Sequence, residues 1–103
     1  EVDTVTIVGY MTNNCDIATA VGAEELGLAA EILSDATGAI HLANEAGQVS
    51  ADQLHETLLV LLHSNFAAVA TTQAWTAAVA AGHALPKCDL GTSAAQGRAA
   101  FGA

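Results

Sequence analysis

The feature that most constrains this chain is its near lack of proline, since Pro86 is the only one among 103 residues. Alanine is the commonest residue. Alanine is the best helix former and proline the worst, so a long stretch of the chain can form helices without an internal break. Small alanine side chains also let helix backbones approach closely. We therefore expect an all-α fold: a small bundle of four to five helices forming a single domain over residues 1–103.

Capping residues and apolar spacing divide the first half of this bundle into segments. Asn13 and Asn14 are candidate N-caps for a helix over residues 15–33. A second helical segment is expected over residues 36–46, and the two could equally form one long, bent helix. We expect residues 15–82 as a whole to supply the core helices.

The clearest local signal is a capping box at the start of the next helix. Ser50 is followed three residues later by Gln53, so each side chain can bond a free backbone N–H group of the first turn. Five consecutive aliphatic residues follow at 58–62 and cover every side of a helix. A helix of this kind is usually buried all round, which favours a central position in the domain.

A further helix is expected over residues 66–81, unless the preceding helix simply continues. Gly82 suits the position just after a helix C-terminus, and Pro86 shortly beyond it suits a stop. Residues 83–103 then form a return segment and a short C-terminal helix.

The N-terminal segment, residues 1–14, is ambiguous. Its valines and threonines favour a strand, yet Val2, Val5 and Val8 could line one face of a helix. We favour a helix because no second strand is evident for pairing. If the segment is extended, it forms an edge strand whose free backbone groups need a partner.

The two cysteines, Cys15 and Cys88, lie near opposite ends of the chain. An even cysteine count in a small domain fits a disulfide formed in an oxidising compartment. We therefore expect a Cys15–Cys88 bridge that closes the bundle, and secretion of the protein. The alternative is two free, buried thiols in a cytosolic protein.

The charge distribution is one-sided and excludes two classes of partner. The formal charge is −9, and Lys87 and Arg98 are the only lysine and arginine, so residues 1–86 hold no permanent side-chain cation. Phosphate groups attract lysine and arginine, so we expect neither a nucleic acid nor an anionic membrane surface as a partner.

No recognised catalytic or metal-binding motif is present. The four histidines, His41, His55, His63 and His83, do not have the spacing of a known metal or haem site. The serines do not match a nucleophile motif, and no pair of acids stands out as a general acid and base. We therefore expect a protein that is not an enzyme and carries no cofactor or metal.

Two hypotheses about function remain. The first is a secreted interaction or structural protein that self-associates into a homo-oligomer through apolar, alanine-rich helix faces. The second is a small carrier that binds an apolar, lipid-like or haem-like molecule between its helices, since spaces between bundle helices are common ligand sites. The carrier site would be lined by Leu59, Leu62, Phe66 and Trp75.

Overall fold

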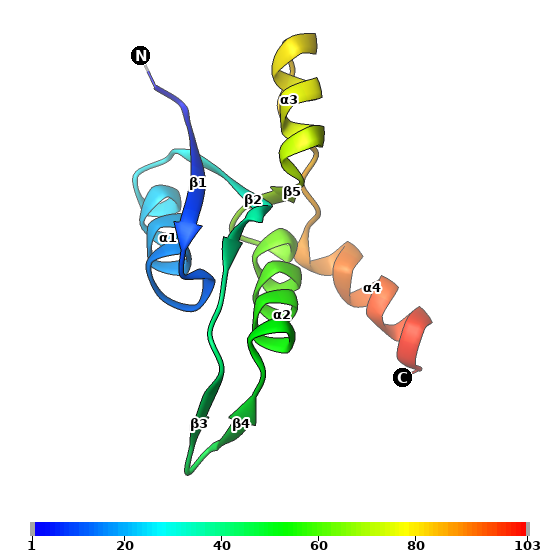
Figure 1. The fold of residues 1–103 in the computed structure, drawn as a ribbon. Coiled ribbons are helices and arrows are strands. Elements are labelled where there is room, and N and C mark those ends of the chain that lie inside the picture. The colour runs from blue at the N-terminus through cyan, green and yellow to red at the C-terminus, as the bar shows by residue number, and fades with distance from the viewer. Residues whose placement is uncertain (1, 103) are drawn as a thin grey trace.

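A parallel β-sheet forms the centre of the molecule, which the computed structural model describes for residues 2–102 (Figure 1). Strands β1, β2 and β5 lie in the order β1-β2-β5, with both neighbouring pairs parallel. Their bounds are Thr4–Tyr10, Ala29–Gly38 and Ala68–Ala70. The expected all-α bundle is therefore wrong, and the fold is α/β.

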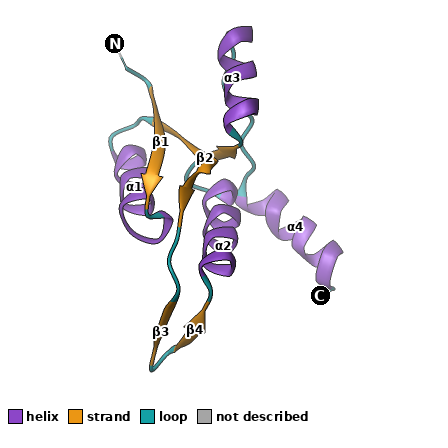
Figure 2. Cartoon of the chain, viewed as in Figure 1, coloured by secondary structure: helices purple, strands orange, loops and turns teal. Residues whose placement is uncertain are grey.

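Helices connect the strands and extend beyond them (Figure 2). A short π-helix, η1, follows β1 directly and continues into α1, while α2 links the sheet to β5. Two further helices, α3 and α4, complete the chain. The bounds are Thr12–Asp16 for η1, Ile17–Glu25 for α1, Ala51–Ser64 for α2, Thr72–Ala81 for α3 and Leu90–Phe101 for α4.

The two faces of the sheet have different coverings. Ile7 of β1 lies opposite Ile32 of β2, and both are buried in one cluster with Ala20 of α1 and Leu62 of α2. Side chains alternate between faces along a strand, so Glu31, the neighbour of Ile32, points the other way. The indole N–H of Trp75 in α3 donates to the Glu31 carboxylate at 3.2 Å. Helices α1 and α2 thus cover one face, and α3 lies on the other.

Strand β2 differs from the expected helix because its buried residues, Ala30, Ile32 and Leu33, do not follow the strict alternation of a half-exposed strand. The stretch AAEIL that begins β2 contains good helix formers and lies within the helix expected over residues 15–33. In the structure, however, α1 ends at Glu25. Gly27, with a φ of 76°, turns the chain into β2. The ambiguous N-terminal segment is a strand, and its partner is this alanine-containing run.

Several helix boundaries do follow from local signals. The capping box at Ser50 and Gln53 is present, with the Gln53 backbone N–H donating to the Ser50 hydroxyl oxygen at 3.2 Å. Helix α3 ends where Gly82 adopts a left-handed φ of 75°. Within residues 2–102, no helix combines the length and apolar character that crossing a membrane requires.

The segment after β2 forms a protruding β-hairpin instead of the expected helix over 36–46. Strands β3 (Leu42–Asn44) and β4 (Gly47–Val49) pair in an antiparallel manner. The Ala46 backbone N–H donates to the Asn44 side-chain oxygen at 2.8 Å and closes the turn. Residues 41–48 are exposed, and the hairpin extends away from the sheet in Figure 1.

The expected disulfide is absent, because Cys15 and Cys88 are both free. Cys15 lies exposed on η1, where the chain leaves β1. Cys88 lies between α3 and α4 beside Leu59 and Val69, and its sulfur accepts a hydrogen bond from the Ser93 hydroxyl at 3.0 Å. The two thiols therefore belong to different parts of the fold. Secretion, which rested on the disulfide, stays a prediction without that support.

Truncation of Leu62 tests the position of the core. Leu62 is 0% exposed, so Leu62→Ala should lower the free energy of unfolding by about 2–5 kcal/mol through lost burial and a residual cavity. Leu61→Ala is the matched control, since its side chain is 48% exposed and should cost about 1 kcal/mol or less. Urea denaturation measures both, and equal losses would contradict this arrangement.

Candidate functional site

The carboxyl ends of the parallel strands meet at one edge of the sheet, which is where open α/β folds bind ligands. Strand β1 ends at Tyr10 and is followed by residues 11–16, which we call the Cys15 loop. The pairing of β2 with β5 ends at Leu33 and Ala70. Polar residues follow each of these points and are the candidates for a site: Thr12, Asn13, Asn14, Cys15, Asp16, Ser34, Asp35, Thr71 and Thr72.

The Cys15 loop presents its thiol to solvent at the start of a continuous helical stretch. The Tyr10–Met11 peptide bond before it is cis. The Met11 carbonyl accepts from the backbone N–H groups of Asn14 at 3.1 Å and Asp16 at 3.3 Å. Cys15 is exposed on η1, which runs directly into α1. The first turn of a helix carries partial positive charge, so a negative charge that develops there is stabilised.

A histidine from α2 joins the Cys15 loop to β2. The Thr12 hydroxyl and His55 Nδ1 are 2.8 Å apart, and His55 Nε2 lies 3.0 Å from the Ser34 carbonyl oxygen. Thr12 is 0% exposed. Both ring nitrogens of His55 are thus engaged with neighbouring elements.

Asp16 is an unusual buried acid in the same loop. Its side chain is only 3% exposed, and burial raises the pKa of its carboxyl above the ordinary value of 3.8, while the nearby charge of His55 partly opposes this. Within residues 2–102, Asp16 Oδ2 and Asn13 Oδ1 are buried without a hydrogen-bond partner. Two hydrogen-bond acceptors beside Cys15 therefore lack donors.

A second polar contact at this edge attaches α3 to β2. Asp35 Oδ1 accepts from both the backbone N–H and the hydroxyl of Thr72, each at 2.8 Å. These bonds to Thr72 hold the pKa of the Asp35 carboxyl below its usual value. The Ser34 hydroxyl donates to the Ala70 carbonyl at 3.3 Å. These hydrogen bonds therefore hold the carboxyl edge of the sheet in place where β2 meets β5 and α3.

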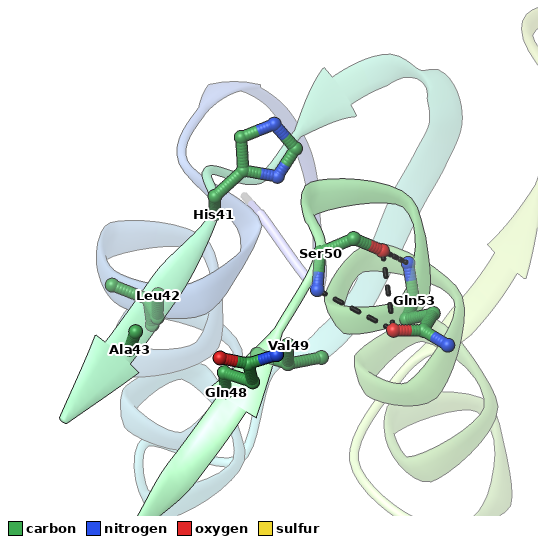
Figure 3. A pocket seen from close by; sticks show the side chains of 7 residues that line it. All are labelled: His41, Leu42, Ala43, Gln48, Val49, Ser50 and Gln53. Atoms are coloured by element: carbon green, nitrogen blue, oxygen red, sulfur yellow. Dashed lines mark hydrogen bonds between the residues drawn. The ribbon is translucent and has the colours of Figure 1, made fainter. Parts of the chain in front are cut away.

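A shallow hollow lies at the base of the hairpin, and none of the residues that line it belongs to the Cys15 loop (Figure 3). Its volume is about 470 Å³, and its walls come from the hairpin and the start of α2. The lining residues are His41, Leu42, Ala43, Gln48, Val49, Ser50 and Gln53. His41 Nδ1 accepts from the Ala51 backbone N–H at 2.9 Å. The hollow holds no nucleophile beyond a hydroxyl already used in the helix cap, so we place the candidate site at Cys15.

The residues predicted to line a carrier cavity do not share one. Leu62 is fully buried, and Leu59 and Phe66 pack against the same cluster under α1 and α2. Trp75 packs in a separate cluster on the other face, beside Ala68, Ala78 and Leu85. The four side chains thus fill two layers of core instead of surrounding a ligand.

Sequence reasoning missed Cys15 as a functional residue because it assigned the thiol to a disulfide. A strand rich in β-branched residues followed by a run of polar residues was the available signal. The contact of Thr12 with His55 joins positions 43 apart, which no local pattern indicates. Across residues 2–102, no three His, Cys, Asp or Glu side chains gather in a way that could hold a metal ion.

The raised pKa of Asp16 predicts a specific pH dependence. The unfolded chain ionises at the lower pKa of 3.8, so ionisation favours unfolding as the pH rises from there through the folded-state value. Asp16→Asn removes this cost and should raise the unfolding midpoint at pH 7. The advantage should shrink as the pH falls towards 3.8, measured by thermal denaturation from pH 7 to 4. An Asn variant less stable than the parent at every pH would contradict the buried-acid interpretation.

Comparison with known proteins places this geometry in a family. The model of the isochorismatase domain matches residues 1–74. A crystal structure from Burkholderia xenovorans LB400, assigned as an isochorismatase, has 44% sequence identity and a TM-score of 0.94, and the match covers 98% of this chain and 49% of that chain. This chain therefore spans about half the length of that relative. Among curated proteins, none matches the sequence significantly.

Two further crystal structures agree over a shorter region. An isochorismatase from Pseudomonas putida KT2440 has 27% identity and a TM-score of 0.65, over 69% of this chain and 37% of that one. A protein from Oleispira antarctica, assigned as an isochorismatase hydrolase, has 31% identity and a TM-score of 0.69, over 73% of this chain and 40% of that one.

These matches overturn the two hypotheses drawn from the sequence. A non-enzymatic, self-associating structural protein and an apolar carrier both conflict with a family model and three structures that bear the name of a hydrolase. The expectation that the protein is not an enzyme is wrong for the same reason. The family model matches residues 1–74 of the chain, and a structure with 44% identity superposes on 98% of the chain. The chain therefore belongs to the isochorismatase family.

Proposed function

We propose that this chain carries the nucleophile of a cysteine-dependent hydrolase, with the Cys15 thiol as the attacking group. The observation that carries the proposal is the position of an exposed thiol at the carboxyl edge of β1, on the first turn of the helical stretch 12–25. Membership of a family named for a hydrolase supports the same reaction class.

The chemistry follows from the properties of a thiolate. The sulfur of Cys15 attacks an electrophilic carbon of the substrate and forms a C–S bond, and the leaving group departs with a proton. Water then cleaves the C–S bond, releases the second product and restores the thiol. Covalent catalysis of this kind divides one difficult hydrolysis into two easier steps. The partial positive charge of a helix N-terminus stabilises negative charge that develops beside it during the reaction.

Groups outside the 103 residues complete the site in this proposal. Among the hydrogen bonds of residues 2–102, none involves the Cys15 sulfur, and we propose that a complementary polypeptide supplies the general base. The matches cover 49% and 37% of the lengths of two relatives. The unpaired acceptors on Asn13 and Asp16 would receive donors from that polypeptide.

The charge of the chain limits how it could hold a substrate. Residues 1–86 contain no lysine or arginine, so a carboxylate on the substrate would bind to backbone N–H groups or to cations of the complementary polypeptide. Small organic molecules of the isochorismate type, named by the relatives, are the proposed substrate class.

An activated ester tests the nucleophile without requiring a complete site. The nitrophenolate of p-nitrophenyl acetate leaves without help from a general acid, so the chain should release a burst of it and retain an acetyl group on Cys15. Cys15→Ser should lower the burst rate by roughly three orders of magnitude. Absorbance and peptide mass spectrometry measure the burst and locate the acetyl group.

Cys88→Ser is the matched control, because it removes the second thiol and should leave the burst intact. Glutathione at the same pH gives the reactivity of an ordinary thiol, which Cys15 should exceed. Acetylation confined to Cys88, or a Cys15 rate no higher than that of glutathione, would refute Cys15 as the nucleophile.

A further inference from the structure

We propose that His55 is the positioning residue of the Cys15 loop, holding Thr12 against β2 so that the thiol keeps its place at the start of the helix. This inference rests on the proposed function of Cys15. It goes beyond that function by assigning a role to α2, whose described residues form no hydrogen bond with the sulfur. The imidazole bridges two elements that are far apart in the sequence, because it bonds Thr12 of η1 with one ring nitrogen and Ser34 of β2 with the other.

The hydrogen-bond chemistry fixes the proton on the ring. The Ser34 carbonyl can only accept, so His55 Nε2 must carry a hydrogen and donate to it across 3.0 Å. In the neutral ring, Nδ1 then accepts the Thr12 hydroxyl hydrogen across 2.8 Å. The Thr12 side chain is 0% exposed, so losing this bond would leave a buried hydroxyl without its partner.

The hydrogen bond between Thr12 and His55 controls the position of the Cys15 thiol. Within residues 2–102, the bond from Thr12 to His55 is the one side-chain hydrogen bond that joins η1 to another element. Thr12 lies three residues before Cys15 in the same turn, and the backbone bonds from Asn14 and Asp16 to the Met11 carbonyl close that turn. Movement of Thr12 would therefore move the whole Cys15 loop.

The charged neighbour of His55 is Asp16, which belongs to the same loop. Their charges interact, and the buried Asp16 carboxyl has an oxygen without a donor. The loop is thus joined to α2 by the hydrogen bond at Thr12, and its Asp16 lies near the same imidazole.

Two conservative replacements separate the two bonds of His55. The amide nitrogen of glutamine reaches the place of Nε2, so His55→Gln can still donate to Ser34 but loses Thr12. The amide of asparagine occupies the place of Nδ1, so His55→Asn can still bond Thr12 but loses Ser34. Thr12→Val removes the hydroxyl with little change in shape.

The test measures how fast iodoacetamide alkylates Cys15 in a Cys88→Ser background, where only one thiol remains. His55→Gln and Thr12→Val should each slow alkylation about fivefold, the factor that one ordinary hydrogen bond is worth. The double variant should also be slowed about fivefold, because both changes remove the same contact. His55→Asn should restore most of the parent rate.

His63 provides the matched control on the same helix. Its Nδ1 accepts from the Val69 backbone N–H at 2.9 Å, so His63→Gln also disturbs a bond between α2 and a strand. This variant should lower the unfolding midpoint while leaving alkylation within about twofold of the parent, a change too small to represent a lost hydrogen bond.

Three results would overturn the proposal: an unchanged rate in His55→Gln, an equal slowing in His63→Gln, or a slowing in His55→Asn as large as in His55→Gln. The last two would mean that His55 contributes only to general stability. Alkylation does not depend on hydrolysis. A Cys15→Ser chain that kept its ester burst would refute the nucleophile while leaving the positioning result intact.

Discussion

The parallel pairing of β1 with β2 is the interaction on which the rest of this structure depends. Two parallel neighbours need a crossover connection, and here η1 and α1 supply it within the 18 residues between Tyr10 and Ala29. The register sets Ile7 opposite Ile32, which gives α1 and α2 a common apolar surface to cover. The same pairing sets Tyr10 opposite Gly38, so the Cys15 loop emerges at the carboxyl edge of the β1–β2 pair.

The second strand of that pair serves both layers of the molecule. Ile32 faces the cluster under α1 and α2, while its neighbour Glu31 bonds Trp75 from α3 on the opposite face. On its other side β1 has no partner strand among residues 2–102. This strand leads directly into the Cys15 loop, which holds the two buried acceptors without donors among residues 2–102.

Helix α2 has a double role in this arrangement. Leu62 carries one side of this helix into the core, and His55, seven residues or about two turns earlier on the same side, reaches the Cys15 loop. Packing of Leu62 therefore sets the distance at which the imidazole can bridge Thr12 and Ser34. The packing that positions this helix in the core therefore also fixes the geometry of the candidate site, although no described residue of α2 forms a hydrogen bond with the Cys15 sulfur.

The sequence by itself determined the features that depend on neighbouring residues: the capping box at Ser50, the end of α3 at Gly82 and the excess of negative charge. It did not determine β2, because alanine and leucine favour a helix by local propensity and only the pairing with β1 overrides that preference. It also left Cys15 open to two interpretations, a disulfide with Cys88 or a free thiol, since the pairing depends on which residues the fold brings together. Tertiary structure decided the strand and excluded the bridge, because a parallel sheet is stabilised by contacts between residues far apart in the chain.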